Sequence, residues 1–153
     1  MTERVRRYGA RVLLLDESDR VLLIRESIED GTTHWLTPGG GIEPGEPPRR
    51  AAEREAREET GIEISIPDDA EPVLVTRREW SWAGVVYDQS DEFFVVRVPD
   101  GTPAAPWHLT EVEQQTWLEL RWWSVSELAG LDEPVVPAEL ATVLTGLLRT
   151  AHG

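Results

Sequence analysis

Eleven residues, Ala51–Gly61 (AAEREAREETG), contain four glutamates. At about 100° per residue on an α-helix, Glu55, Glu58 and Glu59 fall within one arc of roughly 100°, and Glu53 lies on the other side. The i,i+3 and i,i+4 spacings bring the three carboxylates within reach of a common point. Carboxylate oxygens are the ligands that Mg²⁺ takes from proteins, usually together with substrate phosphates. This helix face is therefore a candidate metal site.

The position of these carboxylates in the helix favours a bound cation without requiring one. Like charges at i,i+4 destabilise a helix by roughly a few tenths of a kcal/mol. The last turn of a helix also disfavours anions, by about 0.3–1 kcal/mol each. A cation would offset both costs, whereas Arg54 and Arg57 could neutralise much of the charge on an ordinary solvated helix. From the helix alone, both interpretations stay open.

The flanking residues predict where this helix begins and ends. Pro47 and Pro48 suit its first turn, where backbone amides lack partners. The helix should run to residue 59 or 60, with Gly61 in the left-handed conformation as its stop. The approach, Pro38–Glu46 (PGGGIEPGE), lacks the lysine of a Walker A loop and the spacing of a dinucleotide fingerprint. Alone, its glycines indicate only a turn.

Apolar patterning in the rest of the chain predicts a mixed β-sheet flanked by helices. The expected strands cover residues 10–16, 20–26, 34–37, 62–66, 71–80, 83–88, 91–99 and 120–125, the first two as a hairpin. The Pro-rich residues 100–115 predict a loop with at most one turn of helix. Ser124 and Glu127 resemble a capping box before a short helix, and residues 137–150 predict an amphipathic helix. These elements indicate an α/β fold in a single domain over residues 1–153.

Composition excludes several classes of partner and chemistry. With 29 acidic and 15 basic residues, the chain carries a net charge of −14, which repels phosphate backbones and anionic lipid. We therefore expect no nucleic-acid or membrane partner, and a small anionic substrate would need local positive charge such as a bound metal. The absence of cysteine excludes disulfides and thiolate chemistry. The apolar run Val12–Leu15 ends at Asp16, too short for a signal peptide, and predicts a cytoplasmic protein.

The glycine-rich approach and the helix together match a longer pattern. Gly40, Glu46 and Arg54–Ile62 (REAREETGI) read G-x5-E-x7-R-E-U-x-E-E-x-G-U, where U is an apolar residue. This resembles the Nudix box in every specified position. Residues 34–46 and 120–128 are similar to other segments of Nudix hydrolases, so the MutT-like resemblance extends along the chain. It implies a Nudix-type α/β/α sandwich around a mixed β-sheet, with the box as a loop–helix–loop.

The resemblance also implies roles for residues of the box. The implied metal ligands are Glu55, Glu58, Glu59 and the carbonyl oxygen of Gly40. The metal would be Mg²⁺, with Mn²⁺ as an alternative. Arg54 would orient the glutamates, and Glu46 would tie the loop to the helix.

A general base is expected within the box, as Glu58 or Glu55. Candidates outside the box are Glu92, Glu111 and Glu113, although each of these also fits an ordinary exposed acid. The resemblance leaves this assignment to the geometry of the folded chain.

Candidate substrate-binding residues lie on both sides of the helix. The set consists of Arg25, Gly39, Gly41, Glu92 and Trp80. Arg25 ends an apolar strand, where it could meet a phosphate or be an ordinary surface residue. Trp80 stands where a nucleobase platform could form.

The implied reaction is Mg²⁺-dependent hydrolysis of the diphosphate bond in a nucleoside diphosphate linked to another moiety. A nucleoside triphosphate and a nucleotide-sugar-like substrate both stay open, because no subfamily pattern matches: Thr76–Arg78 stands where ADP-ribose pyrophosphatases tend to carry proline. The alternative is a catalytically inactive Nudix-like nucleotide-binding or sensor domain, which the intact box disfavours. A homodimer is left open.

Overall fold

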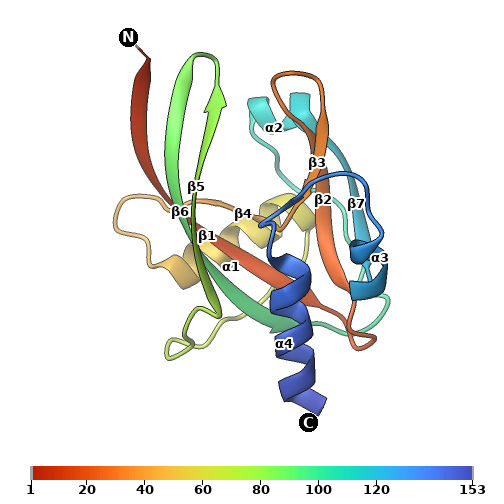
Figure 1. The fold of residues 1–153 in the computed structure, drawn as a ribbon. Helices are drawn as coiled ribbons and strands as arrows, with labels where there is room; N and C mark the ends of the chain where they lie inside the picture. Colours follow the sequence, from red (N-terminus) through yellow and green to blue (C-terminus); the bar gives the residue numbers. More distant parts are fainter. Residues whose placement is uncertain (1, 153) are drawn as a thin grey trace.

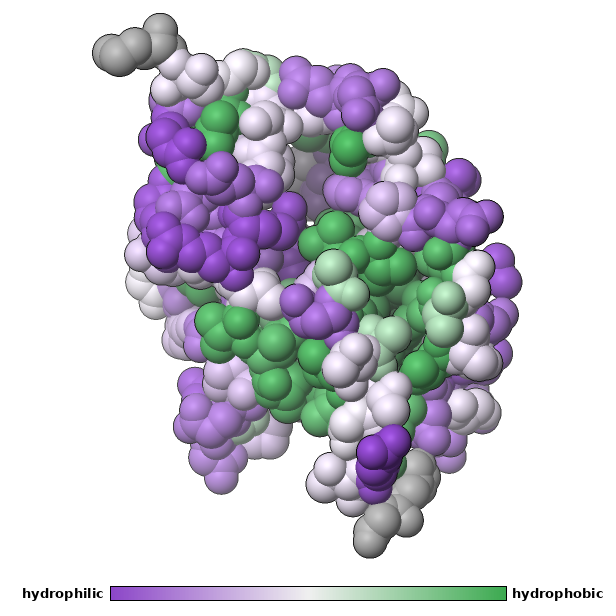
Figure 2. All heavy atoms as spheres, viewed as in Figure 1, coloured by the Kyte–Doolittle hydropathy of each residue, from purple (hydrophilic) through white to green (hydrophobic). Residues whose placement is uncertain are grey.

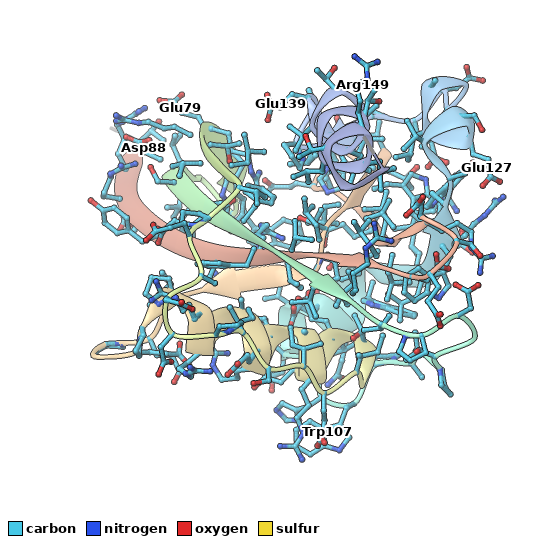
Figure 3. All side chains as sticks on the ribbon, turned by 90° about the horizontal axis from the view of Figure 1, so that it is seen from below. Glu79, Asp88, Trp107, Glu127, Glu139 and Arg149 are labelled. Carbon is cyan, nitrogen blue, oxygen red and sulfur yellow. The ribbon has the colours of Figure 1, made fainter. Side chains whose placement is uncertain are left out.

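The computed structural model describes residues 2–152 as an eight-stranded mixed sheet with helices on both faces (Figure 1). The strands are β1 (Glu3–Leu15), β2 (Val21–Ser27), β3 (Thr33–Leu36), β4 (Gly39–Gly41), β5 (Leu74–Trp82), β6 (Val85–Arg97), β7 (Trp117–Trp123) and β8 (Val135–Val136). The helices are α1 (Pro48–Thr60), α2 (Glu111–Thr116), α3 (Val125–Ala129) and α4 (Leu140–His152). Helices α1 and α4 lie on opposite faces of the sheet (Figure 3), which confirms the predicted α/β fold with a mixed sheet.

Strand β1 lies in the middle of the sheet, and the sheet divides into two arms beside it. Strand β1 pairs in parallel with β6 over its whole length, from Glu3↔Val85 to Leu15↔Arg97. Its pairing with β2 is antiparallel and is recorded only at Leu15↔Val21. The arm of β1, β6 and β5 therefore diverges from the arm of β2, β3 and β7 (Figure 1), and the surface is hollowed between them (Figure 2).

Successive residues of β1 pack on different helices, because side chains alternate across a strand. Val12 and Leu14 share a buried cluster with Ala56 of α1. Leu13 and Leu15 belong to the cluster that also holds the apolar residues of α3 and α4. The face of α1 toward the sheet consists of fully buried alanines, which bring its backbone close to β1 and β4.

Helix α1 begins and ends where the sequence predicts. Pro47 is its extended N-cap, and Gly61 ends it with φ 73°, donating its amide to the Arg57 carbonyl over 2.9 Å. The loop before α2 crosses this end: the amides of Trp107 and His108 donate to the Glu58 carbonyl over 2.9 and 2.8 Å. This loop thus satisfies carbonyls that a helix terminus otherwise leaves unpaired.

The strand prediction for residues 62–66 is wrong. Ile62 and Ile66 are buried as the alternation indicates, but this segment forms no strand, although it packs beside residues of β1 and β6. The Ile66 amide instead donates to the Glu53 carboxylate over 2.7 Å. The alternating burial of this segment therefore reflects side-chain packing, which includes packing on α1, and not hydrogen-bond pairing in a β-sheet.

The strands expected at 83–88 and 91–99 are one continuous strand, β6. The turn that joins it to β5 consists of Ala83 and Gly84, with φ 51° and 80°. Two consecutive positive φ values give a hairpin whose twist matches its strands. Strands β4 and β8 were not predicted, because runs of three and two residues carry no periodicity. No helix within residues 2–152 has the length and hydropathy needed to cross a membrane.

Candidate active site

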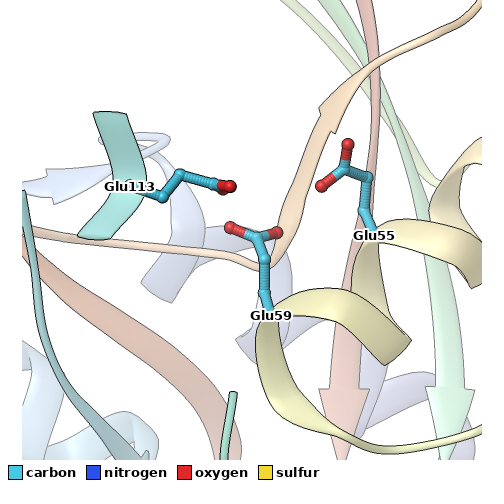
Figure 4. A group of neighbouring side chains, drawn as sticks. All are labelled: Glu55, Glu59 and Glu113. Carbon is cyan, nitrogen blue, oxygen red and sulfur yellow. The ribbon is translucent and has the colours of Figure 1, made fainter. Parts of the chain in front are cut away.

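Three carboxylates from two separate segments converge beside the glycine-rich strand β4 (Figure 4). Glu55 and Glu59 come from α1 and Glu113 from α2, and each offers an oxygen within 4.8 Å of the others. Helix α2 begins with a capping box, in which Glu113 accepts the Thr110 amide over 2.9 Å. The same carboxylate group therefore fixes the start of α2 and faces the glutamates of α1.

Glu59 is the most enclosed of the three. Its side chain is buried, and its Oε1 accepts the Gly39 amide over 2.8 Å. Burial raises the pKa of Glu59 well above its usual value, and the charges of Glu55 and Glu113 raise it further. Burial also raises the pKa of Glu55, although the Arg54 guanidinium opposes this.

The donor set fits a hard divalent cation. Three carboxylate oxygens stand close enough to share one ion, and their mutual repulsion and burial disfavour the charged forms until a cation neutralises them. The site supplies only oxygen ligands, as Mg²⁺ and Mn²⁺ prefer.

Arg54 joins the approach to the helix. Its Nε and Nη2 donate to the two oxygens of Glu46 over 2.9 and 3.0 Å, and Nη2 also donates to the Gly41 carbonyl over 3.0 Å. Its Nη1 donates to Glu55 Oε1 over 3.0 Å and to Glu58 Oε2 over 3.4 Å. The paired hydrogen bonds from Arg54 lower the pKa of Glu46. One guanidinium thus fixes the loop and two box glutamates.

Gly40 lies directly beneath Glu55. A Cβ on Gly40 would stand 2.5 Å from Glu55 Oε1, so any side chain would displace this carboxylate. On the next residue, a Cβ at Gly41 would stand 3.0 Å from Arg7 Nη2. Consecutive glycines of β4 therefore make room for a carboxylate and for a guanidinium.

The structure places the other sequence-predicted residues apart from the three-carboxylate group. Glu58 contacts Arg54 but is not a member of the group. Arg25 donates to Glu133 over 2.8 Å. Glu92 lines a separate hollow of about 390 Å³ with Tyr8 and other residues of β1 and β5.

Trp80 lies on β5 and stacks on Tyr87, with ring centroids 4.2 Å apart. Glu113 was one of several candidates for the general base outside the box, and its place beside Glu55 and Glu59 was not predicted; the Thr110–Glu113 capping box holds it at the start of α2. Glu111, at the start of the same helix, is exposed.

A family model described as "NUDIX domain" matches residues 5–143. The chain belongs to the Nudix hydrolase family. The predicted family and enzyme class are thereby confirmed, and the carboxylate site lies within the matched region.

Relatives of this Nudix hydrolase act on different nucleotides. It is 27% identical to the RNA pyrophosphohydrolase of Rickettsia prowazekii over 141 residues, which cover 84% of this chain and 81% of that protein. It is 36% identical to the human 8-oxo-dGDP phosphatase NUDT18 over 81 residues, covering 52% of this chain but only 24% of that protein. The substrate therefore does not follow from family membership.

Solved structures confirm the Nudix fold over nearly the whole chain. The Caenorhabditis elegans Ap4A hydrolase in a binary complex superposes with a TM-score of 0.67 at 17% identity, covering 94% of this chain and 98% of that one. The MutT protein of Methanosarcina mazei Go1 gives a TM-score of 0.66 at 19% identity and covers 100% of both chains. At these identities the likeness shows the fold alone.

Proposed function

We propose that this Nudix hydrolase cleaves the diphosphate bond of a nucleoside diphosphate linked to another moiety, with Mg²⁺ as its metal and Mn²⁺ as an alternative. The observation that carries this proposal is the group of Glu55, Glu59 and Glu113, whose carboxylate oxygens lie within 4.8 Å of one another. Two of these residues belong to the Nudix box, and the third reaches them from another segment.

Glu55, Glu59 and Glu113 would hold the metal, together with the carbonyl oxygen of Gly40. A metal ion bound there supplies neutralisation of phosphate charge and a water of lowered pKa. Gly39 contributes its amide, which holds the Glu59 carboxylate in place. The carboxylates are thus held in position before the metal binds, and the bound metal would in turn bind the polyphosphate of the substrate.

Glu58 is our candidate for the general base, with Glu55 as the second. Arg54 Nη1 donates to both Glu58 and Glu55, and Glu58 lies outside the three-carboxylate group, so we assign Glu58 the role of base in place of ligand. Arg54 would hold the base in orientation, because a proton acceptor must lie within hydrogen-bond reach of the water that it deprotonates.

The named relatives support a nucleotide with a di- or polyphosphate as the substrate. One is an RNA pyrophosphohydrolase, one an Ap4A hydrolase, and one a putative 8-oxo-dGTP diphosphatase from Bacillus subtilis. A Nudix domain of Shewanella oneidensis NrtR is complexed with ADP ribose. The net charge of −14 opposes a long nucleic acid, so we propose a mononucleotide or dinucleotide.

The test is turnover of a nucleotide panel with Mg²⁺, comparing wild type with Glu59→Gln and Glu58→Gln. Both substitutions should lower kcat by about 10³-fold. Glu63→Gln is the control, because Glu63 is exposed and forms an ion pair with Arg57 outside the three-carboxylate group, and it should stay within about twofold of wild type. A titration with Mn²⁺ followed by electron paramagnetic resonance separates the roles: Glu59→Gln should weaken binding, and Glu58→Gln should not.

Three outcomes would contradict the proposal. No turnover on a broad panel, with nucleotides still bound, would indicate the inactive binding domain instead. Full activity of Glu59→Gln would remove the metal assignment. Weakened Mn²⁺ binding by Glu58→Gln would make Glu58 a ligand and not the base.

A further inference from the structure

A second group of charged residues lies on the arm formed by β1, β6 and β5. It occupies the face of that arm that does not contact α1. Ala10, Val12 and Leu14 of β1 face α1, so the alternate residues of β1 point the other way. Strand register then places one set of polar side chains on this face of three adjacent strands. The set consists of Arg7 and Arg11 of β1, Gln89 and Asp91 of β6, and Arg78 and Trp80 of β5. We call it the arginine group.

Most of the arginine group is joined by hydrogen bonds. Arg11 Nε donates to Asp91 Oδ2 over 3.2 Å, and Arg11 Nη1 donates to the Thr37 carbonyl over 2.8 Å. Gln89 Nε2 donates to Asp91 Oδ1 over 2.8 Å, and Gln89 Oε1 accepts Trp80 Nε1 over 2.8 Å. Both oxygens of Asp91 are thus already engaged, and its side chain is only 1% exposed.

Arg78 has a long ion pair with Asp91 and lies over the Trp80 ring, but its Nε lacks a hydrogen bond within the described part of the chain. Its Nε is buried and has no hydrogen-bond acceptor among residues 2–152. The nearest carboxylate oxygen, Asp91 Oδ2, is 4.0 Å away and already accepts from Arg11. A buried donor without an acceptor is costly, so it calls for a ligand or a function.

The balance of charge around Arg78 is positive. Arg11 and Arg7 act on it as like charges, and Asp91 and Glu26 oppose them. Burial, followed by the charge of Arg11, lowers the pKa of Arg78 to about 10, which leaves it cationic at neutral pH. These three guanidiniums face Asp91 and Glu26, and the charge of Glu59 also acts on Arg11. Glu26 is also engaged by His34 over 2.7 Å.

Arg7 connects this group to the active site. Its Nη2 lies 3.0 Å from where a Cβ of Gly41 would stand, while Glu55 lies over the preceding residue, Gly40. The other side of the Arg7 guanidinium is toward Trp80, with Cζ 5.7 Å from the ring centroid. Glu55 and Arg7 therefore lie over two consecutive residues of β4, on opposite faces of that strand.

We propose that Arg78, with Arg7 and Arg11, forms a second phosphate-binding site, which takes a phosphate of the substrate beyond the bond that is cleaved. Phosphate oxygens match the unfilled donors of a guanidinium in charge and geometry. The substrate class is then a nucleoside polyphosphate with three or more phosphates and not a nucleotide sugar. This assignment of substrate rests on the proposed hydrolase function, whereas the anion site itself does not.

The test compares Arg78→Met with Arg78→Lys and with Arg77→Met. Arg77 is the matched control, because it is exposed on the opposite face of β5 and donates to Asp88 over 2.9 Å. Inorganic tripolyphosphate binding is measured by calorimetry in EDTA, so that no metal takes part. Arg78→Met should weaken binding by about tenfold or more, Arg78→Lys should retain part of it, and Arg77→Met should match wild type.

Turnover then tests the substrate class. Arg78→Met should raise KM for a nucleoside triphosphate by about tenfold and change KM for ADP-ribose by less than about twofold. Its melting temperature should equal or exceed that of wild type, because an unpaired buried donor is removed. A purely structural role would lower the melting temperature and affect both substrates.

Each result bears on one of the two ideas. Unchanged tripolyphosphate binding by Arg78→Met, or an equal loss by Arg77→Met, would overturn the anion site. Equal KM changes for both substrates would overturn the substrate class. Tripolyphosphate binding that depends on Arg78, in a protein that turns over nothing, would leave the anion site standing and remove the proposed hydrolysis.

Discussion

The carboxylate group and the arginine group are two partly buried clusters of charged side chains on either side of β4. The carboxylates lie within 4.8 Å of one another; the Arg54 guanidinium hydrogen-bonds to Glu55, and the charge of Arg11 acts on Glu59. The arginines have Asp91 among them, which is fully engaged, and Arg78 still has an unfilled donor. The carboxylate group thus lacks a cation, and the arginine group lacks an anion. A metal-bound polyphosphate would supply both.

Substitution of two consecutive glycines of β4 should affect the two groups differently. Gly40→Ala should lower kcat by about 10²-fold, because its Cβ would stand 2.5 Å from Glu55 Oε1 and displace that carboxylate. Gly41→Ala should instead raise KM for a nucleoside triphosphate by about threefold with little change in kcat, because Arg7 can shift its flexible end. Steady-state kinetics of the two variants measures this split.

The matched control for both is Gly146→Ala. Gly146 lies in α4 with open space around its Cα, so alanine should leave kinetics unchanged and stabilise the helix by about 0.5–1 kcal/mol. If Gly40→Ala and Gly41→Ala changed kcat and KM in the same way, the two groups would not be separate.

Thermal unfolding with and without Mg²⁺ tests the carboxylate group. At about 100 times Kd, Mg²⁺ should stabilise wild type by about 2.7 kcal/mol, or roughly 5–10 °C in the melting temperature. Glu59→Gln should melt higher than wild type in EDTA, because it removes a buried charge that Glu55 and Glu113 repel. The Gln side chain can still accept the Gly39 amide.

The same substitution should abolish the response to Mg²⁺. Differential scanning calorimetry gives both melting temperatures in one series. A Glu59→Gln protein that melts lower than wild type in EDTA would show that Glu59 stabilises the fold directly, and the carboxylate repulsion would not be the dominant effect.

The smallest expected effect concerns the way in which α2 positions Glu113. Thr110→Ala removes the cap of α2, and Ser124→Ala removes the equivalent capping box of α3. Each should cost about 1 kcal/mol of local or global stability. Only Thr110→Ala should also weaken Mg²⁺ binding, by about threefold, as a calorimetric titration would measure. Equal Mg²⁺ affinities of the two variants would mean that α2 does not position the third carboxylate.

The box helix could be predicted from the sequence because its signals are local. Pro47 and Gly61 bound it, and the glutamate spacing places Glu55 and Glu59 on one face. Glu113 could only be one candidate among several, since contacts between the loop before α2 and the end of α1 bring it to the site. Distance along the chain hides such contacts from any pattern of spacing.

The arginine group shows the same limit on the sheet. Alternation along β5 separates Arg78 and Trp80 from Arg77, and this is visible in the sequence. That Arg78 meets Arg11 depends on the parallel pairing of β1 with β6, whose partners lie about eighty residues apart, from Glu3↔Val85 onward. The prediction of a strand at 62–66 was wrong for the converse reason. Alternating burial can arise from packing alone and does not require hydrogen bonds to a neighbouring strand.

The loop that crosses the end of α1 has a consequence for the order in which the protein becomes active during synthesis. A nascent chain that has released Gly61 contains the whole box, but the amides of Trp107 and His108 that bind the Glu58 carbonyl are still to be made. Glu113 follows five residues after His108. The complete carboxylate group therefore exists only after Glu113 has left the ribosome, so release of the box and completion of the proposed metal site are separate events.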